Sequence, residues 1–261
     1  MAITQHAKRW AFPMLRQYAK RFPHHQCTRR GIRYEVDLRE MIDFRIYFGR
    51  GWEPFTRQFL EREVRPGHVV VEVGANVGSL TLEIARLVGP SGIVHAVEPT
   101  AGAFAKLERN ASLNRELAAR VRRHRLLMSD VKDSTANRDL RWSWRIDDAP
   151  ITREEVDAPA VPLDRLVTTA GIDRLDLLKI DVDGHETMVL RGATGTLREL
   201  KPTVLIELDE TSLAPRGSSV AEAIDVLERL GYRGYRLDGT SVREAAKGKG
   251  PQAHNAVFRP T

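Results

Sequence analysis

The stretch between residues 69 and 80 constrains the fold of this chain most strongly, because an apolar run breaks into a glycine-rich turn and then resumes with helical spacing. The valines between positions 69 and 73 suit a strand that is buried on both faces of a parallel sheet. Gly74 and Gly78 lack Cβ atoms, as expected where backbone must come close to a ligand. This pattern predicts a nucleotide-binding βα unit.

A second apolar run, at residues 93–97, ends at Glu98, which stands 24 residues after Gly74. In nucleotide-binding α/β folds, an acid at about this separation, at the end of the second strand, holds the ribose hydroxyls. We therefore expect Gly74 and Glu98 to belong to one adenosine site. Glu98 is expected to accept hydrogen bonds from both ribose hydroxyls.

The residues of the turn bear on which adenosine ligand is held there. A dinucleotide fingerprint needs a glycine where this turn has Asn76, so that a pyrophosphate can lie against bare backbone. Glu72 lies within the strand just before the turn, and a carboxylate there would repel a pyrophosphate but attract a sulfonium and an ammonium. S-adenosylmethionine carries both cations, so Glu72 is expected near its methionine part. NAD, and a tight turn without any ligand, are the alternatives.

Alternating strand and helix patterns along the chain predict an α/β fold. Strands are expected at residues 69–73, 93–97, 122–128, 175–181, 203–208, 232–237 and 254–259. The last two strands follow one another without a helix, so we expect a Rossmann-like, doubly wound and mostly parallel seven-stranded sheet with an antiparallel last strand. Residues 51–261 are predicted to form this domain, and residues 1–50 a basic arm with a helical extension.

Four segments resemble the motifs of the FkbM-type family of S-adenosylmethionine-dependent methyltransferases, in order and in separation, at residues 72–79, 96–99, 178–186 and 189–193. The resemblance extends from about residue 52 to residue 260, and it implies a class I methyltransferase fold. It also implies O-methylation of a hydroxyl on a sugar, a glycolipid or a polyketide-type natural product. Two positions depart from the family pattern: Glu72 stands where Asp is common, and the acid-Gly-x-Glu run carries Asp183 and His185.

The acidic run at residues 181–186 is where we expect the chemistry, because three carboxylates and an imidazole stand within six residues. Methyl transfer needs an acceptor oxygen that is aimed at the methyl group and loses its proton as the bond forms. Asp181 is placed to orient the acceptor or the cofactor, and His185 to act as base. His254, on the last strand, is the rival base, and a plain position at a helix N-terminus is the alternative for His185.

The same run permits a metal interpretation, which is the less favoured one. Asp181, Asp183 and Glu186 offer hard oxygen ligands of the kind that Mg²⁺ accepts, and a bound ion would lower the pKa of an acceptor hydroxyl. Glu186 could instead accept hydrogen bonds from backbone amides at the start of its helix. No Cys/His spacing for zinc is present in the sequence.

Further residues are expected to contact the cofactor. Asp130 follows the third strand and is placed to accept from the adenine amino group, with Ser129 as the near alternative. The family has an aromatic-Glu pair ahead of its core, and the resemblance assigns Trp52 and Glu53 to it. Glu53 is therefore expected to face the methionine ammonium, or else to lie on the surface.

The positive charge of the chain is confined to its N-terminal arm. Residues 1–30 hold seven basic residues and no acid, whereas the rest of the chain has one more acid than base. Aromatic residues lie among these charges, so the arm could lie on anionic lipid, pack on the domain as a solvated helix, or form a mobile tail. Pro13 and Pro23 are expected to limit its helices to short pieces. The nearly neutral remainder argues against a nucleic-acid partner.

The sequence favours a cytoplasmic enzyme, in solution or at the inner face of the membrane. Cys27 is the single cysteine, and no apolar run approaches the roughly 18 residues that a membrane span needs. The leading hypothesis is an S-adenosylmethionine-dependent O-methyltransferase with a small-molecule or glycolipid hydroxyl acceptor. Its rivals are an NAD-dependent oxidoreductase and an S-adenosylmethionine-binding regulatory protein without catalysis. The oligomeric state is left open.

Overall fold

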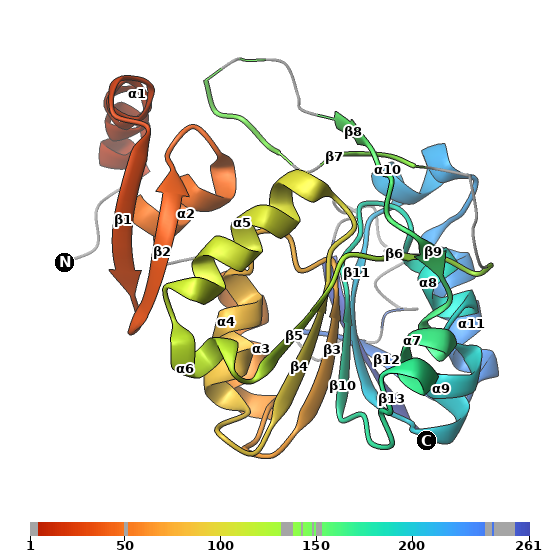
Figure 1. Ribbon diagram of the computed structural model, residues 1–261. Helices are drawn as coiled ribbons and strands as arrows, with labels where there is room; N and C mark the ends of the chain where they lie inside the picture. The colour runs from red at the N-terminus through yellow and green to blue at the C-terminus, as the bar shows by residue number, and fades with distance from the viewer. Residues whose placement is uncertain are drawn as a thin grey trace.

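The computed structural model describes residues 5–49, 52–131, 138–141, 143–147, 149, 153–237, 242 and 254–261. A seven-stranded sheet runs through the centre of the molecule in the order β12-β13-β11-β10-β3-β4-β5 (Figure 1). Its strands are β3 (Val69–Val73), β4 (Ile93–Val97), β5 (Val121–His124), β10 (Leu177–Ile180), β11 (Thr203–Leu208), β12 (Tyr232–Arg236) and β13 (His254–Pro260). In this sheet β13 runs antiparallel to both of its neighbours, and the pairs from β11 to β5 are parallel. The predicted Rossmann-like sheet with an antiparallel last strand is confirmed.

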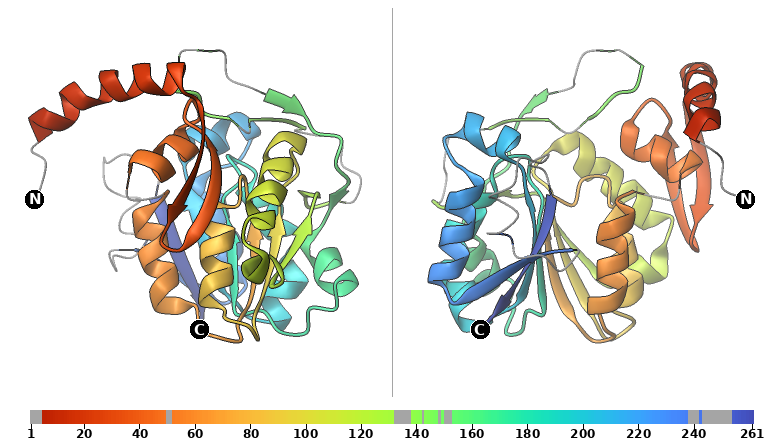
Figure 2. Two further views of the ribbon diagram at one scale, coloured as in Figure 1. Left: turned by 60° about the vertical axis from the view of Figure 1, so that its left-hand side comes forward. Right: turned by 180° about the vertical axis from the view of Figure 1, so that it is seen from behind.

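Helices cover both faces of this sheet (Figures 1 and 2). One face carries α3 (Pro54–Glu63), α4 (Ser79–Leu87), α5 (Ala101–Ser112) and α6 (Arg115–Ala118), and the other α7 (Leu163–Thr169), α8 (Glu186–Arg191), α9 (Thr194–Glu199) and α11 (Val220–Arg229). Alternation along β3 explains why both faces are apolar: Val70 packs in the cluster that contains α3 and α4, and Val71 in the cluster that contains α8 and α11. Both valines are fully buried, which stabilises the fold by about 1.5–3 kcal/mol each.

The chain makes an excursion between β5 and β10, and here the predicted strand at 122–128 is wrong. It is divided in two: β5 ends at His124, and β6 (Leu127–Met128) leaves the sheet to pair with β9 (Ala160–Val161). The reason is that Leu127 packs in a small separate cluster with residues 156–160. β7 (Asp139–Arg141) and β8 (Arg153–Glu155) form an antiparallel hairpin. After β11 follow α10 (Glu210–Leu213) and a 3₁₀ turn (Ala214–Arg216).

The N-terminal extension contains a β-hairpin besides its helices, which the sequence analysis did not predict. It consists of α1 (Gln5–Arg21), β1 (His24–Arg29), β2 (Ile32–Asp37) and α2 (Met41–Phe48). Arg30 and Gly31 link the strands with φ of 53° and 81°, as a two-residue type I′ turn requires. Two side chains continue the edge of β2: Asn114, just before α6, accepts from the Arg33 amide, and Asn110 of α5 accepts from the Glu35 amide, each at 2.9 Å.

Helix α1 runs through Pro13, so the prediction that this proline limits the helix is wrong. A proline inside a helix removes one backbone donor and costs about 3 kcal/mol. Leu15 and Ala19 of the same helix pack with the hairpin and α2, which offsets part of that cost.

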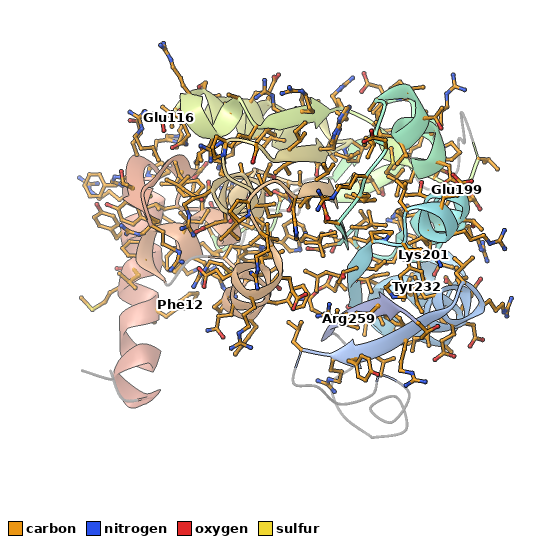
Figure 3. All side chains as sticks on the ribbon, turned by 90° about the horizontal axis from the view of Figure 1, so that it is seen from below. Phe12, Glu116, Glu199, Lys201, Tyr232 and Arg259 are labelled. Carbon is orange, nitrogen blue, oxygen red and sulfur yellow. The ribbon has the colours of Figure 1, made fainter. Side chains whose placement is uncertain are left out.

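α1 and the end of α9 lie at opposite ends of the molecule, as Phe12 and Lys201 show in Figure 3. No helix in the described ranges, α1 included, is long and apolar enough to cross a membrane.

Candidate active site

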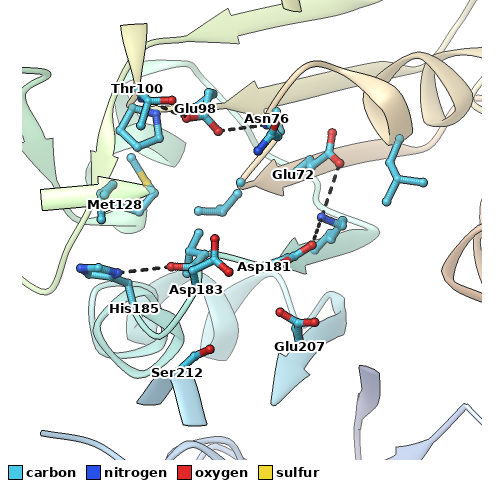
Figure 4. A pocket seen from close by; sticks show the side chains of 18 of the residues that line it. Glu72, Asn76, Glu98, Thr100, Met128, Asp181, Asp183, His185, Glu207 and Ser212 are labelled. Carbon is cyan, nitrogen blue, oxygen red and sulfur yellow. Dashed lines mark hydrogen bonds and ion pairs between the residues drawn. The ribbon is translucent and has the colours of Figure 1, made fainter. Parts of the chain in front are cut away.

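A cavity of about 460 Å³ lies beyond the carboxyl ends of the central strands (Figure 4). The chain leaves β3 toward β4 and β5 and later returns to β10 on the other side of β3, so the loops after β3 and β10 diverge. Ligands in open α/β sheets bind in the crevice at such a point. The cavity is lined by Trp52, Glu53, Glu72, Gly74, Asn76, Glu98, Asp181, Asp183, His185 and Glu207, among others. Sequence positions far apart therefore meet in one site.

The two glycines of the turn are required by contacts within the protein, which corrects the expectation that both make room for a ligand. Gly74 has φ of +88°, and a Cβ there would lie 1.8 Å from the backbone oxygen of Asp181. Gly78 has φ of +82°, and its Cβ would lie 2.4 Å from Cδ1 of Leu107 on α5. Gly74 lines the cavity, whereas Gly78 does not. The glycines thus let the loops after β3 and β10, and helix α5, pack closely.

The carboxylate of Glu98 holds the loops after β3 and β4 in place. Its Oε2 accepts from the amide of Asn76 at 2.9 Å, and its Oε1 accepts from the amide and the hydroxyl of Thr100 at 2.9 and 2.5 Å. Asn76 has φ of 47°, a left-handed conformation that its side chain supports by accepting from the Val77 amide. Three of the roughly four acceptor positions of the carboxylate thus go to loop donors. Glu98 lies at the predicted place, and it shapes the cavity as well as lining it.

A buried lysine lies between two carboxylates at the floor of the cavity. Lys179 of β10 pairs in register with Glu72 of β3, and its Nζ lies 3.6 Å from Glu72 Oε1 and 3.0 Å from Asp181 Oδ2. Burial lowers the pKa of Lys179, but Asp181, Glu72 and Glu53 together outweigh it and raise the pKa above its ordinary value. Burial raises the pKa of Glu72 to about 7, against the lowering effects of Lys179 and a 2.5 Å hydrogen bond from the Thr81 hydroxyl.

Two further carboxyl groups face the same space. Glu53 precedes α3, and its Oε2 is buried with no hydrogen-bond partner among the described residues. Burial, and next the charge of Asp181, raise the pKa of Glu53. Burial raises the pKa of Glu207 to about 9, with further contributions from Asp181 and Glu53. Figure 4 shows Glu207 and Asp181 facing each other. This wall, made of Glu53, Glu72, Asp181 and Glu207 around a single lysine, favours a cationic ligand.

The acidic run between β10 and α8 separates its side chains. His185 is 3% exposed, lines the cavity and places Nδ1 3.2 Å from the carbonyl oxygen of Val182. Glu186 turns back to accept from the amides of Val182 and Gly184 at 3.1 and 3.2 Å. Asp183 is exposed, with φ of 49°. Glu186 therefore serves the turn that presents His185.

The magnesium alternative is not supported by this arrangement. Asp181 pairs with Lys179 and Glu186 accepts from backbone amides, so these two carboxylates serve partners within the protein, whereas Asp183 is exposed at the edge of the cavity. In the part of the chain that the structure describes, no group of three or more His, Cys, Asp or Glu side chains is arranged to hold a metal ion.

Two further residues expected at the site, Ser129 and Asp130, do not line the cavity. Ser129 is buried elsewhere, and Asp130 lies 3.9 Å from Arg191. Residues 126–128 line the cavity in their place, since β6 turns away from the sheet just before Ser129. His254 starts β13 opposite Leu208, and its side chain lies outside the described part of the structure.

The sequence of the domain can be compared with known proteins. The profile of the methyltransferase FkbM domain matches residues 72–233, which is more than half of the chain. The chain belongs to the FkbM methyltransferase family. The 31-O-demethyl-FK506 methyltransferase FkbM of Streptomyces tacrolimicus is 35% identical, over 50% of this chain and 61% of that protein, so this chain spans about three fifths of the relative's length.

Two solved structures also resemble the chain. The methyltransferase FkbM from Methylobacillus flagellatus KT is 14% identical, with a TM-score of 0.47 over 77% of this chain and 50% of that chain. The fibrillarin of Aeropyrum pernix, solved with natively bound S-adenosyl-L-methionine, is 13% identical, with a TM-score of 0.48 over 91% and 83%.

Two residues of this FkbM methyltransferase site were missed by sequence reasoning. Lys179 and Glu207 each stand within an otherwise apolar run, in the strands expected at residues 175–181 and 203–208, and neither is among the residues expected at the site. The available signal was a charge within each of two otherwise apolar runs, Glu72 in the first and Lys179 in the second. Opposite charges at the same depth of two buried strands indicate that the strands are neighbours, since a buried ion needs a partner.

Proposed function

We propose that the chain is an S-adenosylmethionine-dependent O-methyltransferase that acts on a hydroxyl group of a sugar, a glycolipid or a polyketide-type natural product. The observation that carries the proposal is the acid-rich wall of the cavity, where Glu53, Glu72, Asp181 and Glu207 line the space and Lys179 pairs with two of them, Glu72 and Asp181. A cationic ligand suits this wall, and an anionic pyrophosphate does not. Membership of the FkbM family supports methyl transfer as the reaction.

The residues of the cavity fit S-adenosylmethionine. The buried Oε2 of Glu53 is an acceptor for which the described fold provides no donor, and a ligand ammonium would satisfy it. Glu72 and Asp181 add negative charge beside the same space. Glu98 would hold the ribose, and the apolar side chains of residues 126–128 would contact the adenine. When bound, this cofactor supplies a methyl group that its positively charged sulfur activates.

We propose His185 as the base and Asp181 as the residue that orients the acceptor. The carbonyl oxygen of Val182 can only accept, so the proton of the neutral imidazole is assigned to Nδ1. Nε2 then carries a lone pair and can take a proton from an acceptor hydroxyl. Asp181 is held by Lys179 at 3.0 Å, which fixes its carboxylate at the side of the cavity.

The outer wall of the cavity suits an acceptor that carries hydroxyl groups. Both hydroxyls of Thr211 and Ser212 donate to Oδ2 of Asp209, at 2.7 and 3.0 Å, so their oxygens are oriented to accept from a ligand. Arg216 adds guanidinium donors to the lining of the cavity, and Trp144, which packs with the N-terminal extension, adds an aromatic surface. A sugar-like group, with hydroxyl donors and apolar ring faces, matches this mixture of contacts.

Calorimetric titration of the full chain with S-adenosylmethionine and with NAD tests the cofactor assignment. We expect S-adenosylmethionine to bind at least about ten-fold more tightly than NAD, and Glu53→Gln to weaken only the former, since it removes one charge next to the ligand ammonium. Tighter binding of NAD would favour an oxidoreductase. Incubation with methyl-labelled cofactor and hydroxyl acceptors tests catalysis, and tight binding without any transfer of label would favour a non-catalytic binding protein.

A further inference from the structure

Helix α1 and the residue that follows it expose an unusual amount of apolar surface. Across the described residues, six large hydrophobic side chains are exposed, and two of them, Phe55 and Val131, are scattered elsewhere. The other four gather at α1: Phe12, Met14, Tyr18 and Phe22. Met14 is 74% exposed and Phe22 50% exposed, so water reaches most of the first side chain and half of the second. Isolated apolar residues on a surface are ordinary, but a cluster marks a contact site.

The four exposed side chains form a strip along α1, and each keeps at least 39% of its surface exposed. Met14, Tyr18 and Phe22 follow one another at four-residue spacing, and the amide of Phe22 still donates to the carbonyl of Tyr18 at 2.8 Å, so the three share a helix face. Leu15 and Ala19 occupy the neighbouring face and pack on the hairpin and α2. Phe12 also contacts the Phe44 ring of α2 and Tyr18 the Phe48 ring, with ring centres 5.8 and 6.0 Å apart. These contacts cover part of both rings and leave the rest of them exposed, together with most of Met14 and half of Phe22.

Basic residues accompany this strip. The first 30 residues carry seven positive charges and no acid, and the rest of the chain carries a net charge of −1. Lys20 and Arg21 are exposed at the end of α1, where the Arg21 guanidinium lies 5.6 Å from the Phe22 ring centre. Cores of protein interfaces are depleted in lysine, whereas helices that lie in a membrane interface combine an aromatic apolar strip with lysine and arginine. The positive charge of the arm therefore favours an anionic bilayer over a protein partner.

We propose that α1 and Phe22 dock this protein onto an anionic bilayer, with the strip of Phe12, Met14, Tyr18 and Phe22 in the headgroup region. The docked helix lies close to the cavity. Arg16 of α1 donates to the carbonyl of Ile146, two residues after Trp144 of the cavity wall. α1 also lies at the same end of the molecule as β7 and β8 (Figures 1 and 2), and Leu140 of β7 lines the cavity. Docking therefore holds the cavity next to the membrane, independently of which reaction the cavity performs.

Flotation of the full-length protein with lipid vesicles tests the proposal. We expect binding to phosphatidylcholine vesicles that contain a third of phosphatidylserine, and at least about ten-fold weaker binding to pure phosphatidylcholine. Raising the salt concentration should weaken the binding, because it screens the charges. The double variant Met14→Ser/Phe22→Ser should bind the anionic vesicles roughly ten-fold more weakly, whereas Phe55→Ser, which removes an even more exposed ring on α3, should bind them like the unchanged protein.

The charge is tested by a matched pair of double variants. Lys20→Glu/Arg21→Glu should bind anionic vesicles at least about ten-fold more weakly, and Arg198→Glu/Lys201→Glu, with the same change of charge at the far end of the molecule, should bind like the unchanged protein. Circular dichroism establishes that each variant is folded.

Three results would overturn the proposal. Equal binding to neutral and anionic vesicles would show that charge plays no part. An equal loss in both members of either pair would show that α1 is not the contact. A dimer in sedimentation that Met14→Ser/Phe22→Ser abolishes would assign the strip to a second copy of this chain.

Discussion

Replacing Glu72 by Gln should stabilise the fold and weaken the binding of a cationic ligand at the same time. Glu72 is 1% exposed, and its Oε2 accepts from the Thr81 hydroxyl while its Oε1 lies 3.6 Å from Lys179. Glutamine has the shape of the protonated acid and keeps an oxygen for Thr81. Lys179 keeps its other partner, Asp181, at 3.0 Å. The substitution therefore removes one ionisable group from the site and keeps the hydrogen bond from Thr81 and the ion pair of Lys179 with Asp181.

The size of the effect follows from the pKa of Glu72. Burial raises this pKa from the ordinary 4.5 to about 7, so the folded protein keeps the proton over a range where the unfolded chain loses it. A group whose pKa is higher in the folded protein than in the unfolded chain stabilises the fold fully at pH values below the unfolded pKa. This stabilisation is lost as the pH rises through the folded pKa. At about 1.4 kcal/mol per pH unit, the wild type should lose about 3 kcal/mol relative to Glu72→Gln between pH 4.5 and pH 7.

Urea unfolding of both proteins at pH 5 and pH 8 measures this effect. We expect the difference in unfolding free energy to move by about 2–3 kcal/mol in favour of the variant between the two values. Any cost of placing an amide beside Lys179 is the same at both pH values, so it cancels. A difference that stays constant from pH 5 to pH 8 would show that Glu72 is ionised in the fold throughout, and would refute the reasoning. A calorimetric titration with S-adenosylmethionine near pH 7 should also release protons, because a cation favours the ionised carboxylate.

Further variants test the other parts of the site. Glu98→Ala should weaken cofactor binding by about 2–3 kcal/mol in a calorimetric titration, and Thr100→Val, which removes only a loop donor, should change it by less than about 1 kcal/mol; equal losses would show that loop shape alone matters. His185→Ala should lower kcat by about 10²–10⁴-fold with cofactor affinity intact, and full activity would eliminate this histidine as the base. Gly74→Ala should destabilise the fold by at least about 3 kcal/mol in urea, because its Cβ meets backbone. Gly171→Ala, with φ of +64° and open space, should cost only about 1 kcal/mol, and similar costs at both positions would contradict the close approach of the two loops.

Three central strands could be predicted from the sequence to the residue. The expected strands at 69–73, 93–97 and 203–208 coincide with β3, β4 and β11. Each is a short apolar run that is followed directly by Gly or an acid, and the strand is buried on both faces, so a shift by one residue would expose an apolar side chain. Local sequence is sufficient in these places because burial on both sides leaves the strand no alternative position.

The β-hairpin of the extension could not be predicted in the same way. β1 (His24–Arg29) is polar, and its side chains alternate only between exposed and half-buried. The partners that fix its neighbour β2 are Asn110 and Asn114, which stand more than seventy residues away in the chain. The pattern of an edge hairpin is weak when its stability comes from a helix that local sequence does not connect with it.

The lysine-carboxylate cluster has the same origin as the hairpin, a contact between distant segments. Lys179 meets Glu72 because β10 pairs with β3 in one register, and the two residues are more than a hundred positions apart. The local sequence around Lys179 reads only as an apolar strand with one charge. Only the pairing of β3 with β10 brings the charge of Lys179 next to the buried carboxyl group of Glu72.

The residues that follow each strand remain the right ones to inspect for ligand contacts, provided that the end of the strand is known. Gly74 follows β3, Glu98 follows β4, and Asp181 follows β10, and all three line the cavity. Ser129 was selected because the strand was expected to continue to residue 128, whereas β5 ends at His124. Residue 126, two positions beyond the observed end, does line the cavity. The expected end of the strand lies four residues too late because Leu127 and Met128 are apolar for another reason: β6 pairs with β9, Leu127 packs with residues 156–160, and Met128 packs in the core cluster that contains α8.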